Sequence, residues 1–171
     1  MGISVLGIGN LLMSDEGVGV HAVKALAEGY RFPDNVRIID GGTAGLDLLY
    51  YIEGTRRLLI IDAVDAGLSP ASVRLYEGRQ VPAALSQKFS VHQIGLQDLL
   101  FALSITGEAP EEICLVGVQP LKVEMGLELS PQVNVAMPAL IAAVMGKLES
   151  WGARPSCKQQ AASNKYKNEG E

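Results

Sequence analysis

The sequence predicts an α/β fold: a three-layer α/β/α sandwich with a mostly parallel, twisted sheet. Short apolar runs suited to buried strands alternate along the chain with amphipathic segments suited to helices. The run at residues 58–61 is continuously apolar, as expected of a central parallel strand covered on both faces. In such a sheet the carboxyl ends of the strands share one edge, and ligands bind there.

The first unit is a strand, a loop and a helix. Residues 3–8 are apolar, a turn with Gly9 and Asn10 follows, and a helix is expected over residues 16–28. The segment lacks the third glycine of a dinucleotide-binding fingerprint and the lysine of a P-loop. Asp15 and Glu16, at the start of the expected helix, would also repel phosphate. The loop therefore favours a cation or a basic group as its ligand.

The later elements follow the same alternation. They are expected as a strand at 36–39, a short helix from 46, a strand at 58–61, an edge strand at 72–76 that is a candidate for antiparallel pairing, a loop or broken helix at 77–89, a helix after 95, a strand at 113–118, a loop at 119–130 and a final helix through 148. That helix begins either at Pro138 or near Pro131, with Pro138 as a kink. Residues 1–151 form one predicted domain, and the polar residues 152–171 are expected to be a disordered, dispensable tail.

Composition limits the classes of function. The 171 residues are 48% hydrophobic, which is typical of one globular domain, and a net charge of −5 argues against a nucleic-acid partner. No basic leader and no apolar run of about 18 residues is present, which predicts a cytoplasmic protein without a membrane partner. Cys114 is expected in the core and Cys157 as an exposed thiol without a role.

Acidic residues end the first three predicted parallel strands or follow them. Glu16, Asp40 and Asp62 are therefore expected to converge at one edge of the sheet, where His92 can join them. Two carboxylates and an imidazole, from Glu16, Asp62 and His92, suit a divalent metal such as nickel or zinc. Ordinary interpretations also exist: Asp15 is a good helix N-cap, an acidic residue in the first turn such as Glu16 favours the helix dipole, Asp62 can cap a loop, and His92 can be a polar residue with satisfied hydrogen bonds near a helix start.

Nucleophilic catalysis has little support in the sequence. There is no G-x-S-x-G elbow and no H-E-x-x-H motif. Cys114 lies in the middle of a predicted strand, where nothing would activate a thiolate. His21, the other histidine, lies on the first predicted helix and is expected to be a surface or boundary residue.

The chain resembles the hydrogenase maturation endopeptidases from about residue 3 to residue 148. The resemblance is carried by six segments in the same order: residues 6–20, L-G-I-G-N-L-L-M-S-D-E-G-V-G-V; residues 40–45, D-G-G-T-A-G; residues 62–65, D-A-V-D; residues 90–95, S-V-H-Q-I-G; residues 117–120, G-V-Q-P; and residues 129–131, L-S-P.

The resemblance implies a definite activity and site. Members of this family cleave a short C-terminal extension from the precursor of the [NiFe] hydrogenase large subunit once nickel has been inserted. By resemblance, the catalytic residues that contact nickel are Glu16, Asp62 and His92, and the segment that selects the substrate is Asp40, Gly41, Gly42 and Thr43. No tightly bound cofactor is expected, because the nickel belongs to the substrate; the expected partner is the large-subunit precursor, and the expected state is a monomer.

Two other functions stay open on the same ligands. A nickel-binding chaperone would use these three residues without hydrolysis, and a zinc-dependent hydrolase would hold a resident metal. A nucleotide-binding domain is a weaker third alternative, because the glycine and lysine signals are missing.

Overall fold

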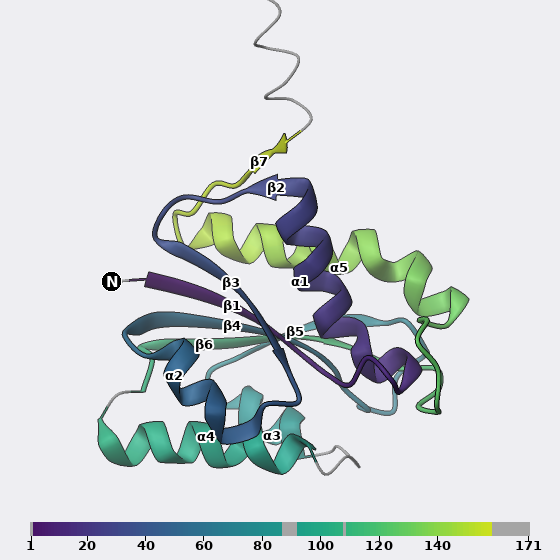
Figure 1. Cartoon of the computed structure of the whole chain (residues 1–171), viewed down its shortest axis with the longest axis horizontal. Helices are drawn as coiled ribbons and strands as arrows, with labels where there is room; N and C mark the ends of the chain where they lie inside the picture. Colours follow the sequence, from purple (N-terminus) through teal and green to yellow (C-terminus); the bar gives the residue numbers. More distant parts are fainter. Residues whose placement is uncertain (1, 87–91, 108, 159–171) are drawn as a thin grey trace, which may run out of the picture.

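The computed structural model describes residues 2–86, 92–107 and 109–158 (Figure 1). Its elements, in chain order, are β1 (Gly2–Ile8), the 3-10 helix η1 (Ser14–Gly17), α1 (Val18–Gly29), β2 (Tyr30–Arg31), β3 (Val36–Gly42), the 3-10 helix η2 (Gly45–Asp47), α2 (Leu48–Ile52), β4 (Thr55–Ala63), β5 (Val73–Glu77), α3 (Gln80–Ser86), α4 (His92–Thr106), β6 (Glu112–Val118), α5 (Pro131–Ser150) and β7 (Ser156–Cys157). The predicted alternation of strands and helices is confirmed, and the segment predicted as a loop or broken helix contains α3; its residues 87–89 lie outside the described residues.

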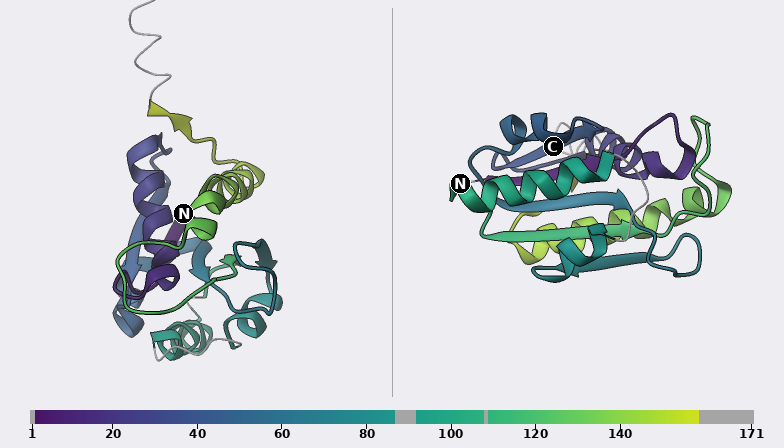
Figure 2. Two further views of the ribbon diagram at one scale, coloured as in Figure 1. Left: turned by 90° about the vertical axis from the view of Figure 1, so that its right-hand side faces the viewer. Right: turned by 90° about the horizontal axis from the view of Figure 1, so that it is seen from below.

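Five strands form the central sheet in the order β3-β1-β4-β6-β5. The first four are parallel, and β5 runs antiparallel to β6 at the edge, as its alternating sequence predicted. α1 and α5 cover one face of the sheet, and α2, α3 and α4 cover the other (Figures 1 and 2). The structure therefore confirms the three-layer α/β/α sandwich and places β4 at the centre of its sheet.

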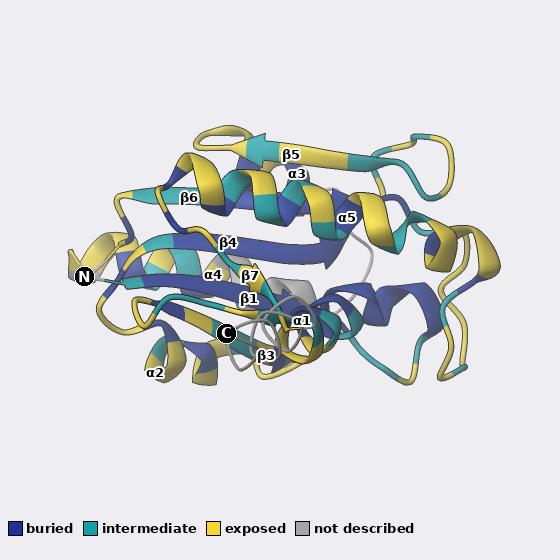
Figure 3. Ribbon diagram, turned by 90° about the horizontal axis from the view of Figure 1, so that it is seen from above, coloured by how far each residue is buried: buried dark blue, intermediate teal, exposed yellow. Residues whose placement is uncertain are grey.

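The centre of β4 joins the two halves of the core. Leu58, Leu59, Ile60 and Ile61 are all completely buried, and Figure 3 shows the strand buried along this length. Successive side chains of a strand point to opposite faces. Leu59 and Ile61 accordingly pack in the cluster beneath α1 and α5, while Leu58 and Ile60 pack in the cluster beneath α2, α3 and α4.

Glycines let α1 lie unusually close to the sheet. A Cβ atom on Gly19 would lie 2.2 Å from the carbonyl oxygen of Ile61 and 2.3 Å from that of Ile8. A Cβ atom on Gly7 would lie 2.2 Å from the carbonyl oxygen of Gly19. Only glycine fits at these two positions, so the first turn of α1 rests directly on the ends of β1 and β4.

The sequence left two possible starts for α5, near Pro131 or at Pro138. The helix begins at Pro131, and Pro138 lies inside it. The Ser130 side chain caps the helix by accepting a 3.4 Å hydrogen bond from the Val133 amide. Proline suits the first helical position because its missing N–H is not needed there.

α5 also bears on the membrane prediction. Among the residues that the structure describes, α5 is the one helix long and apolar enough to cross a membrane by length and composition. A core helix of a soluble protein can meet the same criterion. Here Leu140, Val144 and Leu148 are buried in the cluster against the sheet.

The predicted boundary of the tail at residue 152 is wrong for residues 152–158. Ala153 is 2% exposed and belongs to the core, and β7 pairs antiparallel with β2. Lys158 Nζ donates a hydrogen bond to the carbonyl oxygen of Ala27. Backbone pairing does not depend on side-chain polarity, so composition gave no sign of it. Cys157, predicted to be exposed, is half-buried in β7.

We expect truncation after Gly152 to destabilise the domain by about 1–3 kcal/mol, because it removes the buried Ala153 and the pairing of β2 with β7. Urea unfolding followed by circular dichroism measures the change. Truncation after Lys158 is the matched control and should leave the midpoint unchanged. Equal midpoints for both truncated proteins would show that residues 153–158 contribute nothing.

Candidate active site

The predicted acidic residues lie around the carboxyl end of β1. Gly7, near that end, pairs with Asp40 of β3 on one side and with Ile61 of β4 on the other. Asp62 follows Ile61 directly, and η1, which carries Glu16, lies against β4. The topology therefore brings Glu16, Asp40 and Asp62 to one edge of the sheet, where the carboxyl ends of parallel strands gather.

Burial separates these three carboxylates into two kinds. Glu16 is 5% exposed and Asp62 is 1% exposed. Asp40 is exposed: its Oδ1 accepts a 3.1 Å hydrogen bond from the Gly42 amide, and its Oδ2 lies 3.9 Å from Lys24 Nζ. Glu16 and Asp62 therefore supply two buried carboxylates at this edge of the sheet, and carboxylate oxygens are ligands of divalent cations.

The segment Asp40–Thr43 lies at the same edge of the sheet as Glu16 and Asp62. Gly42 adopts the left-handed region, with φ of 47°, and its carbonyl oxygen accepts a 3.0 Å hydrogen bond from the Gly9 amide. Thr43 is exposed, whereas Gly41 is buried against Leu6. The segment Asp40–Thr43 is thus hydrogen-bonded to the loop that carries Glu16, and its outer side is exposed.

Gly9 fixes the backbone at Glu16. Its φ is 138°, and a Cβ atom on it would lie 1.8 Å from the Glu16 carbonyl oxygen. The chain leaves β1, passes through Gly9 and folds back, so that Glu16 sits against the turn. The glycine of the opening motif serves this close backbone approach.

Asp15 does not cap its own helix, contrary to its ordinary interpretation. No side-chain cap is present at η1 or at α1. Asp15 is completely buried, and its carboxylate accepts four hydrogen bonds from the other side of the loop region. The donors are the amides of Leu121 (2.9 Å) and Lys122 (3.1 Å), and the amide (2.6 Å) and hydroxyl (2.8 Å) of Ser130. Such charge-assisted bonds are the strong class of protein hydrogen bonds.

Further backbone contacts join the opening loop to residues 119–130. The Ser14 amide donates to the Gly126 carbonyl oxygen at 2.8 Å, and the Gly126 amide donates to the Leu12 carbonyl oxygen at 2.9 Å. Ser14 Oγ donates to the Glu124 carbonyl oxygen at 3.0 Å. Ser14 has a φ of 48°, which is uncommon for a residue with a side chain. The two loops therefore form one structure next to Glu16.

Gln119 holds the segment after Asp62, a role that the sequence analysis missed. Its Oε1 accepts hydrogen bonds from the amides of Ala66 (2.9 Å) and Leu68 (3.1 Å), and its Nε2 donates to Asp65 Oδ1 at 3.0 Å. Gln119 is 7% exposed. The one signal available was its position directly after a buried strand, where a polar side chain tends to serve the strand-end edge.

His92 is the first residue of α4, and its side chain lies outside the described residues. Among the side chains that the structure describes, no three His, Cys, Asp or Glu residues form a group able to hold a metal ion. The described part of the candidate site is thus the buried pair Glu16 and Asp62. The three-residue site with His92 stays a prediction.

The residues dismissed as nucleophiles or bases are placed as expected. Cys114 is buried in β6, and burial raises the pKa of its thiol, which disfavours the reactive thiolate. His21 is half-buried on α1. Burial, and then the nearby Lys24 charge, lower the pKa of its imidazole. Neither residue offers an activated nucleophile.

Comparison with known proteins identifies this arrangement. The structure is similar to that of the hydrogenase maturating endopeptidase HybD from E. coli, with a TM-score of 0.90, 38% identity, and coverage of 94% of this chain and 99% of that chain. The hydrogenase 2 maturation protease of Escherichia coli (strain K12) is 41% identical over 153 residues, which span 89% of this chain and 93% of that protein. The hydrogenase expression/formation protein HupD of Rhizobium leguminosarum bv. viciae is 41% identical over 163 residues, 94% of this chain and 81% of that protein.

These likenesses define an endopeptidase, a hydrolase built on an α/β sandwich. Residues 20–147 match the hydrogenase maturation protease family. The chain belongs to this family, and the resemblance found in its sequence motifs is confirmed.

We expect Asp15→Asn to destabilise the protein by about 3 kcal/mol, since the amide cannot accept all four hydrogen bonds and brings its own N–H groups towards the donors. Asp47→Asn makes the same chemical change on an exposed residue of η2 and should stay within about 0.5 kcal/mol of the wild type. Urea unfolding midpoints measure both. A loss below about 1 kcal/mol for Asp15→Asn would mean that the carboxylate does not hold the two loops together.

Proposed function

We propose that the protein removes the C-terminal extension of the nickel-loaded [NiFe] hydrogenase large-subunit precursor, with the nickel of the substrate as the recognition element. Membership of the hydrogenase maturation protease family supports an endopeptidase acting on a hydrogenase subunit. The buried carboxylates Glu16 and Asp62 at one edge of the sheet are the observation that carries the nickel part of the proposal.

The donor set suits a metal that arrives with its own ligands. Glu16 and Asp62 supply hard oxygen donors, and His92 would supply an imidazole, a ligand type suited to nickel. Three protein ligands are one fewer than a closed structural zinc site has, and none of them is a thiolate. Nickel held by cysteine sulfurs of the precursor would complete its coordination only when precursor and protease meet. Affinity would then depend on the metal and on the polypeptide together.

Charge attraction would contribute to this selection. Carboxylate oxygens attract a divalent cation, and a precursor without nickel offers no such cation to Glu16 and Asp62. The protease would therefore distinguish loaded from unloaded precursor at the step of binding.

Two catalytic roles of the substrate's nickel are compatible with this geometry. The metal can polarise the scissile carbonyl group or lower the pKa of an attacking water. Alternatively, its contact with Glu16, Asp62 and His92 can serve to hold the scissile bond in position. The exposed segment Asp40–Thr43 would contact the precursor's polypeptide on either side of that bond.

We expect Glu16→Gln, Asp62→Asn and His92→Ala each to lower the rate of precursor processing by at least about 100-fold, because each removes a ligand of the substrate's metal. The two amide variants keep the side-chain volume, and urea unfolding verifies that each variant is folded at the assay temperature. Electrophoresis and mass spectrometry of the precursor measure the rate, with Asp47→Asn as the control. Normal rates in all three variants would rule out this site.

We expect the purified protein to cleave nickel-loaded precursor without added metal and to leave nickel-free precursor intact. Elemental analysis of the dialysed protein should find well below one metal ion per chain. Stoichiometric metal after dialysis, with equal cleavage of both precursors, would instead indicate a zinc-dependent hydrolase. Tight binding of loaded precursor without any change in its mass would indicate a nickel-binding chaperone.

A further inference from the structure

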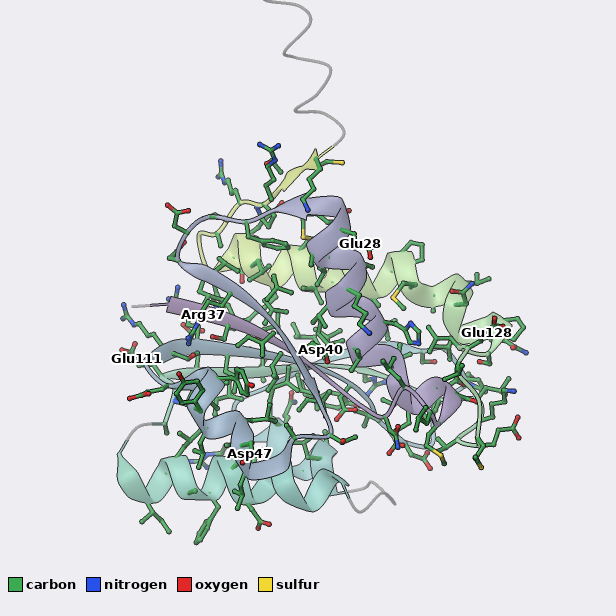
Figure 4. The ribbon with its side chains drawn as sticks, viewed as in Figure 1. Glu28, Arg37, Asp40, Asp47, Glu111 and Glu128 are labelled. Carbon is green, nitrogen blue, oxygen red and sulfur yellow. The ribbon has the colours of Figure 1, made fainter. Side chains whose placement is uncertain are left out.

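Five large apolar side chains are exposed beside the candidate site. They belong to the opening loop and to residues 119–130, and we call them the apolar rim: Leu12 (61% exposed), Leu121 (44%), Val123 (50%), Met125 (89%) and Leu127 (67%). A single exposed leucine needs no explanation, but a group of this size on one pair of joined loops is typical of a protein–protein contact. In Figure 4 the neighbouring Glu128 marks this end of the molecule, opposite to Arg37 and Glu111.

The apolar rim is held in place from below. Asp15 fixes the amides of Leu121 and Lys122, and the Gly126 amide is bonded to the Leu12 carbonyl oxygen. These contacts are buried or half-buried, whereas the apolar side chains above them point to solvent. Because the backbone of these two loops is already ordered, the protein loses little conformational entropy when a partner covers the apolar rim.

The apolar rim is continuous with the candidate site. Asp15 accepts hydrogen bonds from the loop at residues 119–130, which carries four of the five side chains of the apolar rim. Asp15 also directly precedes Glu16 in the chain. A polypeptide whose scissile bond lies at Glu16 and Asp62 belongs to a folded subunit, and the body of that subunit must then lie over the surrounding loops. The site and the apolar rim are therefore parts of one contact surface.

We propose that the apolar rim is the docking surface for the folded body of the large-subunit precursor, in addition to the contacts of its extension at the site. This inference rests on the proposed function. The complementary patch on the precursor is apolar, with few acidic groups, because Glu124 and Glu128 are exposed among the apolar side chains.

The charges of the loop favour a protein partner over a membrane. Residues 121–129 carry one lysine and two glutamates, which leaves one net negative charge. Lys122 is further engaged with Glu124, at 2.7 Å. Anionic lipid headgroups attract clusters of basic residues, which this loop lacks. A second copy of this chain would bring a loop with the same net negative charge, and two like-charged loops repel each other.

The test measures binding of the wild type, Met125→Asp and Val123→Asp to immobilised nickel-loaded precursor by surface plasmon resonance. Both replaced side chains are at least half exposed, so the folded state should not change. Ile105→Asp is the matched control: it places the same charge on an apolar residue that is 69% exposed near the end of α4, on a different element. Unfolding midpoints verify that all variants are folded.

We expect the Kd to rise at least about tenfold for Met125→Asp and for Val123→Asp, and to change less than about twofold for Ile105→Asp. In processing assays the first two variants should show a raised KM with an unchanged kcat at saturation, the pattern of lost binding without lost chemistry. A site variant such as Glu16→Gln lowers kcat, whatever its effect on KM, and this loss of kcat distinguishes catalysis from docking.

Four results would overturn the docking surface. The first two are an equal Kd for all variants and no binding by the wild type. The others are binding of anionic lipid vesicles that Met125→Asp abolishes, and a dimer in sedimentation velocity that Met125→Asp dissociates. The mass of the precursor is recorded separately. Binding that depends on Met125 without any cleavage would support the docking surface and contradict the proposed function.

Discussion

The buried carboxylate of Asp15 is the interaction on which the geometry of the functional edge depends. It accepts hydrogen bonds from Leu121, Lys122 and Ser130, residues more than 100 positions later in the chain. A buried carboxylate is tolerated only when it is well bonded, so the two loops must meet in one arrangement to satisfy it. The same bonds set the position of Glu16, the start of α5 at the Ser130 cap, and the shape of the exposed loop above.

Close backbone packing is the second constraint on this edge of the sheet. Gly7 and Gly19 let α1 rest on the ends of β1 and β4, and Gly9 lets the chain fold back onto Glu16. These contacts fix the backbone at Glu16 against β1 and α1. The protein thus keeps the carboxylates of Glu16 and Asp62 buried at the strand-end edge of the sheet.

The sequence predicted the sheet, its parallel strands and the edge strand that was a candidate for antiparallel pairing, because strand periodicity and the parallel topology determine them. It did not predict the roles of Asp15 and Gln119. Their partners lie far along the chain, and an acidic residue before a helix looks like an ordinary cap. It also placed the end of the domain too early, because the pairing of β7 with β2 is a backbone interaction that composition does not reveal.

The central claim is that Glu16 and Asp62 touch the nickel carried by the substrate. Nickel K-edge X-ray absorption tests it directly, on loaded precursor alone and on loaded precursor mixed with the protein and frozen before turnover. We predict additional oxygen or nitrogen neighbours at about 2.0–2.2 Å with the wild type, and fewer of them with a Glu16→Gln, Asp62→Asn double variant, in which only His92 of the three proposed ligands is left. A nickel coordination shell that is the same with and without the wild-type protein, in a sample where the complex has formed, would contradict the claim.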